Sequence, residues 1–308
     1  MRIDSISSEA ALLSPYLCNA KSVSSKPYDE ENLTNTGILY TSDQPNTLLN
    51  SEDGIVIAKT SSNSVSLNQQ YQSRLSVLGF YSGPMDDNLS SDISKKAIKN
   101  FQMVYGLTTN GTLNSTTKSK LSTAYANYNQ IYSSSSFATL SSSSNFNLDS
   151  TERMNFARTW AFLKVGMGLT PKQISGVMGN MYAESRFSSD NANNQSYPGD
   201  HNSSYSYSAN DEVAYGLIQW KSSSRKQGLL NKADVMGLSV SDINTLFAFS
   251  KDEMNSSYYS PYWSQIKASS SVDTVSDIFC QNIEVAGAGG KSTRRSYSNT
   301  IYNLLGAN

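Results

Sequence analysis

The stretch GNMYAESRF (residues 179–187) places one glutamate, Glu184, among small and apolar residues that read as a buried helix. An ionised carboxylate in such a place is costly unless it is paired or its pKa rises. A carboxyl group that stays protonated near neutral pH can act as a general acid and protonate the leaving oxygen of a glycosidic bond. The alternative is a structural glutamate that caps a backbone or pairs with Arg158 or Arg186.

The helix that must position Glu184 is predicted by its cap and its spacing. Residues 170–173 (TPKQ) have capping-box spacing, with Pro171 at the first helical position. Four apolar residues follow at i, i+3, i+4 and i+7 spacing: Ile174, Val177, Met178 and Met181. At about 100° per residue, Glu184 lies within about 20° of Val177 and continues this core-facing stripe. A second stripe consists of small residues, at which another helix can approach closely: Gly176, Gly179 and Ala183.

A second catalytic group is sought in the polar loop 188–213. Its acidic residues are Asp190, Asp200, Asp211 and Glu212. We favour Asp190 and Asp211, because they flank the loop ends nearest to Glu184 and to the segment that begins at Tyr215. A partner about 5 Å away suits a retaining reaction, and one at about 6.5–9.5 Å an inverting hydrolysis. Without a partner, the N-acetyl group of the substrate could assist, which yields hydrolysis or an anhydro product.

Composition bounds the remaining possibilities. The 308 residues suit two compact domains, and with 38% hydrophobic and 16% charged residues part of the length is expected outside any core. The net charge of −1 gives no reason to expect nucleic acid as a partner. The single histidine, His201, lies in the polar loop without Cys or His neighbours, so no zinc site and no cofactor are expected. Cys18 and Cys280 are expected to be free thiols.

The sequence also lacks two targeting features. No apolar run approaches the about 20 residues that span a bilayer. The first 17 residues lack the apolar core of a secretory signal peptide. Action outside the cytoplasm would therefore require lysis, a dedicated export apparatus or delivery in a larger particle.

The predicted fold is mainly α, in four segments. Residues 1–64 are polar and aperiodic, and we expect them to be flexible or ordered only on a larger assembly. Residues 65–124 read as small helices around one core. Serine runs at 133–136 and 141–144 indicate a flexible linker over 125–148. A second capping box at 149–152 opens an all-helical unit that extends to residue 308.

Residues 66–121 resemble the peptidoglycan-binding domain of three small helices. The resemblance lies in LGFYSG (78–83), Met85-Asp86, Phe101-Gln102, YGL (105–107) and Asn110-Gly111. The first turn departs from the family pattern, because Asp86-Asp87 stands where Asp-Gly is usual. The resemblance implies binding to cell-wall glycan or stem peptide, for which we name Tyr81, Asp86 and Tyr105. The alternative is a packing module that binds nothing.

Most of residues 150–305 resemble the phage tail lysozyme type of domain in the lysozyme-like superfamily. The matching segments are TWAFL (159–163), GLT (168–170), GVMGNM (176–181), Glu184-Ser185, GLIQW (216–220) and Arg225. The resemblance implies that Glu184 is the catalytic acid. It also implies a substrate-binding role for Ser185, Tyr215, Gln219, Trp220 and Arg225. Glu284 matches a family position that is often followed by Arg-Pro, but Val285-Ala286 follows here, which puts its role in doubt.

Together these features predict a peptidoglycan hydrolase that cuts β-1,4 bonds, with a muramidase reaction favoured. A lytic transglycosylase of the same fold is one alternative. A catalytically inert wall-binding component of a tail or export apparatus is the other. The flexible linker would raise the local substrate concentration for the catalytic unit.

Overall fold

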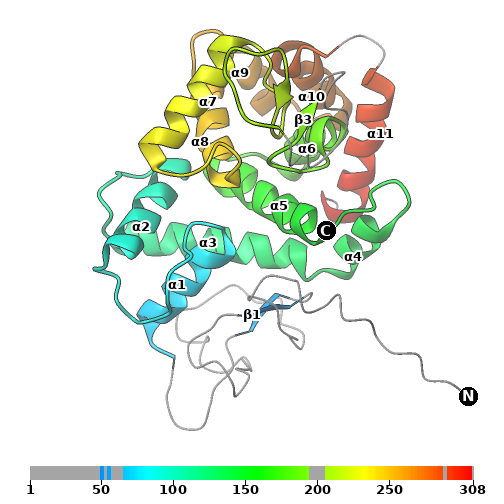
Figure 1. Ribbon diagram of the computed structural model, residues 1–308. Coiled ribbons are helices and arrows are strands. Elements are labelled where there is room, and N and C mark those ends of the chain that lie inside the picture. Colours follow the sequence, from blue (N-terminus) through cyan, green and yellow to red (C-terminus); the bar gives the residue numbers. More distant parts are fainter. Residues whose placement is uncertain (1–48, 52–53, 57–64, 194–204, 287–289, 307–308) are drawn as a thin grey trace, which may run out of the picture.

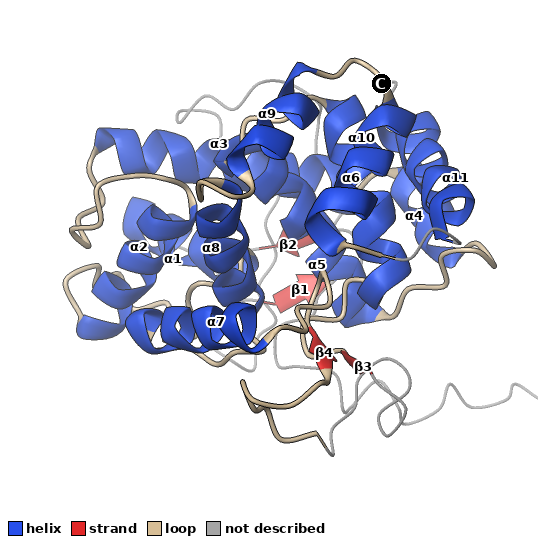
Figure 2. Ribbon diagram, turned by 90° about the horizontal axis from the view of Figure 1, so that it is seen from above, coloured by secondary structure: helices blue, strands red, loops and turns tan. Residues whose placement is uncertain are grey.

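The computed structural model describes residues 49–51, 54–56, 65–193, 205–286 and 290–306. These residues form eleven α-helices, joined by short π-helical turns, and two small pairs of strands (Figures 1 and 2). The mainly α fold is therefore confirmed. No helix of the described ranges is long and apolar enough to cross a membrane. Of the expected N-terminal segment only β1 (Leu49–Ser51) and β2 (Gly54–Val56) are described, and they pair antiparallel.

The first helical unit contains α1 (Leu67–Val77), α2 (Asp92–Val104) and the N-terminal half of α3 (Ser115–Tyr132). Ser66, Ser91 and Asn114 cap the three helices by accepting hydrogen bonds from backbone amides of the first turns. The apolar stripes meet in a core that includes Leu75, Leu78, Ile98, Phe101 and Leu121, all buried. The expected three-helix arrangement is thus present.

The Ser-rich segment is not a flexible linker. α3 continues to Tyr132, and α4 (Ser135–Ser142) follows almost at once, with Ser134 as its N-cap. Phe137 and Leu140 of α4 are fully buried, and the Phe137 ring lies 4.8 Å from that of Phe156. The prediction failed because serine runs carry little signal of their own, whereas the apolar residues between them stabilise the helix by burial.

The two helical units pack directly on each other. α3 lies along α5 (Ser150–Ala161), as Figure 1 shows near the middle of the molecule. Side chains of the second unit also donate to backbone carbonyls of the first: Asn244 to Leu78 at 3.2 Å and Lys251 to Met103 at 3.0 Å. Asn100 returns such a bond to Met236. One apolar core therefore extends through both units.

The second unit surrounds α6 (Pro171–Ser185). After α5 come η3 (Phe162–Gly166) and α6, and then the strands β3 (Ala192–Asn193) and β4 (Ala214–Tyr215), which pair antiparallel. The remaining elements are α7 (Ser223–Met236), α8 (Ile243–Met254), α9 (Ser260–Ala268), α10 (Val272–Phe279), η4 (Cys280–Glu284), α11 (Lys291–Ile301) and η6 (Tyr302–Gly306). The sequence analysis did not predict α4, which lies in the segment expected to be a linker.

Both predicted capping boxes are confirmed, at Asp149 with Glu152 and at Thr170 with Gln173. The stripe of small residues on α6 also does what was expected. A Cβ on Gly179 would lie 2.1 Å from Ser298 Oγ of α11, and one on Gly176 would lie 2.6 Å from Val275 of α10. Helices α10 and α11 can therefore approach α6 closely, which brings their side chains to its C-terminal end.

Candidate active site

The C-terminal end of α6 is held in place by the segment that was expected to be a linker. The ring of Tyr182 stacks on Phe146 at 4.2 Å, and its hydroxyl donates to the carbonyl of Asn145 at 2.6 Å. The helix ends at Ser185, followed by two residues in the left-handed region, Arg186 at φ +53° and Phe187 at φ +68°. Glu184 therefore lies on a rigid, sharply terminated helix end.

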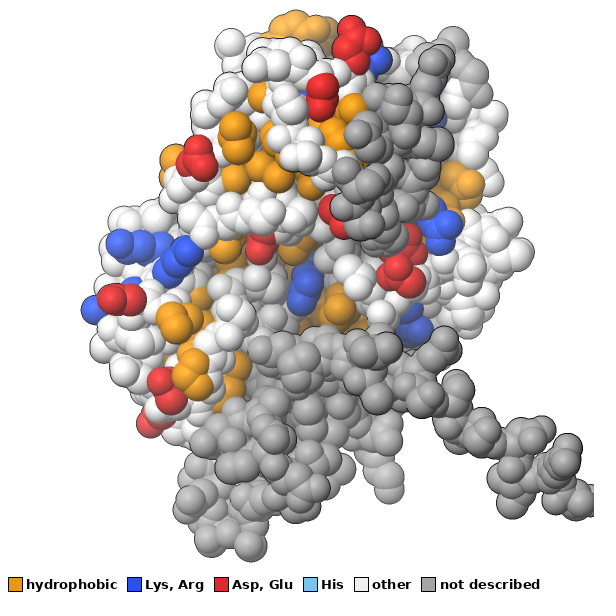
Figure 3. All heavy atoms as spheres, viewed as in Figure 1, with side chains coloured by type: hydrophobic (Ala, Val, Ile, Leu, Met, Phe, Trp, Pro, Cys, Tyr) orange, Lys and Arg blue, Asp and Glu red, His pale blue; other side chains and the backbone are white. Residues whose placement is uncertain are grey.

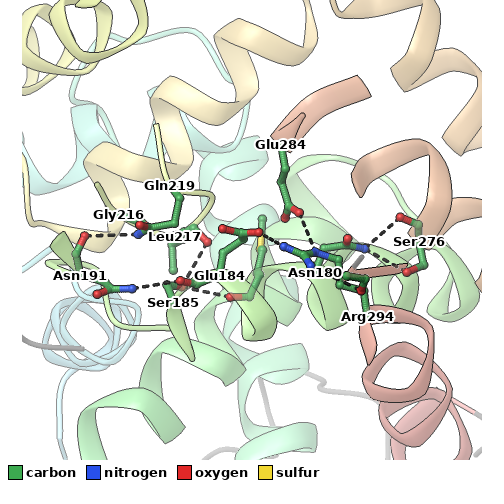
Figure 4. Close-up of polar contacts among 12 residues, drawn as sticks. Asn180, Glu184, Ser185, Asn191, Gly216, Leu217, Gln219, Ser276, Glu284 and Arg294 are labelled. Carbon is green, nitrogen blue, oxygen red and sulfur yellow. Dashed lines mark hydrogen bonds and ion pairs between the residues drawn. The ribbon is translucent and has the colours of Figure 1, made fainter. Parts of the chain in front are cut away.

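A tight turn at residues 216–219 packs against this helix end (Figure 4). Ser185 Oγ donates to the carbonyl of Leu217 at 3.1 Å, and Asn191 Nδ2 donates to the carbonyl of Glu184 at 3.0 Å. The Gly216 amide donates to the Asn191 carbonyl at 2.8 Å. These hydrogen bonds join Asn191 and the turn at 216–219 to the end of α6. Ser185 is buried, so its role in this structure is to position that turn.

Gln219 stands in the turn with φ +54°, a conformation that only glycine adopts without strain. Its Nε2 donates to the carbonyls of Gly216 at 2.9 Å and Asn191 at 3.3 Å. Its Oε1 and the Oδ1 of Asn191 are buried and have no hydrogen-bond partner among the described residues. Strain and unsatisfied acceptors together are typical of a site that keeps hydrogen-bonding capacity for a ligand.

Glu184 is paired with an arginine that the sequence analysis did not consider. Its Oε1 accepts a hydrogen bond from Nη2 of Arg294, on α11 (Figure 4). Neither expected structural partner serves: Arg158 donates to the carbonyl of Val77, and Arg186 pairs with Glu152 at 3.3 Å. The Glu184 side chain is 17% exposed, so the predicted exclusion of water is only partial. A neighbouring guanidinium favours the ionised form of a carboxyl group.

Glu284, whose role was in doubt, lies on the other side of Arg294. Its Oε2 accepts from Arg294 Nε at 3.2 Å, and its side chain is only 1% exposed. Burial raises the pKa of Glu284 well above its usual range, although the nearby Arg225 acts in the opposite direction. Glu184, Arg294 and Glu284 thus form a row in which one guanidinium bridges two carboxyl groups. In the sequence, the burial of Glu284 was indicated only by its apolar neighbours Phe279 and Ile283.

The two favoured loop acids differ from the expected catalytic arrangement. Both oxygens of Asp211 are engaged, by Lys226 and the Val213 amide on Oδ1 and by the Tyr205 hydroxyl on Oδ2. Burial raises the pKa of Asp211, but these hydrogen bonds outweigh it and hold the pKa below its ordinary value. Asp211 therefore anchors this segment in the structure, and a catalytic role for it stays a prediction.

Asp190 accepts from Ser188 Oγ at 2.7 Å, and Glu212 is exposed. Asp200 and His201 lie outside the described residues. Within the part of the chain that the structure describes, no group of three or more His, Cys, Asp or Glu side chains could hold a metal ion. A catalytic role for Asp190 stays a prediction.

Three residues expected in a sugar cleft have partners within the protein. Trp220 is fully buried, and its Nε1 donates to Glu253 Oε2 at 2.6 Å. Arg225 pairs with the same carboxylate, with Nε 2.7 Å from Oε1. Tyr215 is 4% exposed, with the Tyr207 ring 4.8 Å away. Because Trp220 and Tyr215 are covered by their partners, they present no free face to a sugar, whereas 15% of the Arg225 side chain stays exposed.

The residues named for wall binding are also largely internal. Tyr105 is buried and stacks on Phe101 at 4.5 Å. Tyr81 is buried and donates its hydroxyl to the carbonyl of Pro84. Asp86 is exposed, and a hydrogen bond from Gln72 lowers its pKa. Only Asp86 can therefore meet a ligand without a rearrangement of the core. On the face seen in Figure 3, acidic and basic side chains are interspersed.

The second unit is mainly helical and has a polar, strained site at the end of a buried helix. Residues 154–305 match the family model of the phage tail lysozyme, and residues 67–121 match that of a putative peptidoglycan binding domain. The chain therefore carries a phage tail lysozyme domain preceded by a peptidoglycan-binding domain. No curated protein and no solved structure is significantly similar to it. The pair of domains supports a peptidoglycan-degrading function.

Proposed function

We propose that the protein hydrolyses β-1,4 bonds between the amino sugars of peptidoglycan and that Glu184 protonates the leaving oxygen. The observation that carries this is the position of Glu184: partly exposed, at a rigid helix end, beside the strained turn of Gln219 in a phage tail lysozyme domain. Protonation of a leaving oxygen needs a fixed carboxyl group that solvent-borne substrate can reach. Glu184 meets that requirement, whereas Glu284 does not.

Gln219 would hold the substrate in this proposal. Its Oε1 and the Oδ1 of Asn191 are unpaired acceptors that are buried in the closed turn, so a small opening of the turn would present them to the hydroxyl and N-acetyl N–H donors of peptidoglycan sugars. A donor from the substrate would remove the penalty of an unpaired buried acceptor, which is about 1–3 kcal/mol. Binding energy would then be directed to the helix end at which Glu184 lies.

A lytic transglycosylase reaction is the second candidate. It is favoured because Asp211, one of the two favoured loop acids, has both of its oxygens engaged within the protein. The N-acetyl group of the substrate would then assist, as in the absence of a partner carboxylate. Mass spectrometry of the products separates the two reactions, because hydrolysis leaves reducing ends and transglycosylation leaves anhydro-muramyl ends.

The peptidoglycan-binding domain would act as part of a rigid body and not as a tethered module. The buried contacts of α3 and α4 with α5 fix its orientation relative to α6. Wall that is bound by the first domain would therefore meet the second in one orientation. The first domain would therefore orient the wall for the second domain, instead of raising its local concentration through a flexible linker.

The test is turnover of purified sacculi by the Glu184→Gln variant. We expect a loss of about a thousandfold, within the range for removal of a general acid, with folding and wall binding retained. Glu212→Gln, an exposed acid of the same loop region, is the matched control and should keep full activity. Full activity of Glu184→Gln would disprove the assignment. If the wild-type protein binds sacculi but releases no product, the inert wall-binding alternative holds.

A further inference from the structure

The row of Glu184, Arg294 and Glu284 poses a problem for the proposed reaction. A general acid must carry a proton, but Glu184 faces a guanidinium that favours its ionised form. The same guanidinium contacts Glu284 through a different nitrogen, Nε, so both contacts exist at once. Its remaining nitrogen, Nη1, donates to the carbonyl of Gly290 at 3.4 Å. Two guanidinium nitrogens of Arg294 thus contact the two carboxyl groups, and the third contacts a backbone carbonyl.

The burial of Glu284 determines which protonation state of this row is favoured. With both carboxyl groups ionised, the row would carry a net charge of −1, and Glu284 would place an ionised group where its side chain is 1% exposed. Its Oε1 has no hydrogen-bond partner among the described residues, so nothing there compensates a charge on that oxygen. With one proton on the pair, the row is neutral. The structure thus favours two carboxyl groups, one guanidinium and one proton.

We propose that Glu184 and Glu284 share this single proton and that Arg294 neutralises whichever of the two is ionised. Glu284 is then a positioning residue that governs the protonation of Glu184 without touching the substrate. In the free protein the proton lies on Glu284, because Glu184 is the more exposed carboxyl group. Substrate that covers Glu184 removes water from it and makes its ionised form more costly.

The proton balance of this step is closed. Glu284 gives up its proton and becomes a carboxylate paired with Arg294, and Glu184 takes up one proton and becomes the acid. Glu184 then donates that proton to the leaving oxygen, and the row regains a proton from solvent after product release. The net charge of the row is unchanged during the exchange, so the protonation of Glu184 requires no proton uptake from solvent. This inference rests on the proposed function.

Among the described residues, other charged groups near the row have partners of their own. Arg225 of α7 acts on Glu284 but is itself paired with Glu253 of α8. Cys280 of η4 interacts electrostatically with Glu284, Lys291 and Asp277. On α10 and α11, Asp277 pairs with Arg295. Arg294 therefore remains the cation that both carboxyl groups of the row contact.

The test is the pH dependence of sacculus turnover by Glu284→Gln, compared with Glu284→Asp and with wild type. In wild type the row keeps its proton, so activity should be flat through the neutral range. In Glu284→Gln, Glu184 must take its proton from solvent against Arg294. Its activity should therefore rise about tenfold per pH unit as the pH is lowered, until it reaches the wild-type level. Glu284→Asp, which keeps a carboxyl group, should restore the flat profile.

Asp277→Asn is the matched control, because it breaks the ion pair that α10 makes with Arg295, the residue next to Arg294 on α11. It should leave the pH profile unchanged. A Glu284→Gln profile that is parallel to wild type, whatever its height, would overturn the inference, since a merely structural role lowers activity equally at every pH.

A second measurement uses only the wild-type protein and does not depend on its activity. Infrared spectra of the wild-type protein with isotope-labelled glutamate should show one protonated glutamate carboxyl that persists at neutral pH. Absence of that band would overturn the shared proton. If the band is present but wild type yields no glycan product, the proposed function fails and the proton-sharing row stands.

Discussion

Two ion pairs of the second helical unit, Lys226 with Asp211 and Arg294 with Glu184, differ in how completely their hydrogen bonds are satisfied. All three Lys226 Nζ hydrogens have acceptors, in Asp211, Tyr205 and the carbonyl of Val213. Both Asp211 oxygens have donors. In the row of Glu184, by contrast, Arg294 is shared and Glu284 Oε1 is unpartnered among the described residues.

The difference separates an anchor from a reactive group. A buried polar network in which every member is satisfied rigidifies the fold, and Lys226 with Asp211 fixes the segment that leads into β4. A network with one cation between two carboxyl groups can exist in more than one protonation state. From the sequence both Asp211 and Glu184 were candidate catalytic acids, and only the surroundings distinguish them.

The largest expected stability effect tests the anchor. Asp211→Asn leaves the fully buried Lys226 without its counter-ion, which should cost about 3 kcal/mol of the free energy of unfolding. Because the pKa of Asp211 is lowered in the folded state, its contribution is present above the unfolded pKa of about 3.9 and is lost as pH falls. Urea unfolding at neutral and acid pH measures both.

Activity per folded molecule should be unchanged in Asp211→Asn. A catalytic loss much greater than the loss of folded protein would contradict the comparison and return Asp211 to the catalytic site.

The next effect tests the strained turn. Gln219→Gly relieves a left-handed conformation worth about 1 kcal/mol, which the greater entropy of unfolded glycine largely offsets. The carbonyls of Gly216 and Asn191 keep backbone donors, so stability should change by less than about 1 kcal/mol. Turnover should fall roughly tenfold to a hundredfold, equivalent to about 1.4–2.7 kcal/mol. Unchanged turnover would show that Gln219 serves only the turn.

The stabilising contribution of Glu284 should have the opposite pH dependence to that of Asp211. The pKa of Glu284 is raised in the folded protein, so its stabilising contribution is present below the unfolded pKa of about 4.3 and is lost as pH rises. Relative to Glu284→Gln, wild type should lose up to about 1.4 kcal/mol per pH unit above that value, until the folded pKa is reached. Denaturant midpoints of both proteins over a pH series provide the check; a pH-independent difference would refute the raised pKa.

The smallest effect is expected at the exposed pair of Asp277 and Arg295. The Arg295 side chain is 44% exposed, so Asp277→Asn should change the free energy of unfolding by less than about 1 kcal/mol. A loss as large as that of Asp211→Asn would mean that exposure does not separate the two kinds of ion pair.

Local signals in the sequence determined much of the fold. The capping boxes at residues 149–152 and 170–173, the apolar stripe of α6 and its small residues all depend on neighbours within a few turns of one helix. The sequence also singled out Glu184 and the turn that contains Gln219, because their spacing matched a known pattern.

Only the tertiary structure decided which side chains are free to act. Phe137 and Phe146 convert a serine-rich stretch into a packed support, and Trp220 and Tyr215 are covered by residues distant in sequence. Arg294 lies 110 residues from Glu184, and no local pattern links them. Hydrogen bonding and burial depend on what a side chain meets in space, and periodicity along the chain gives the direction of a side chain without its partner.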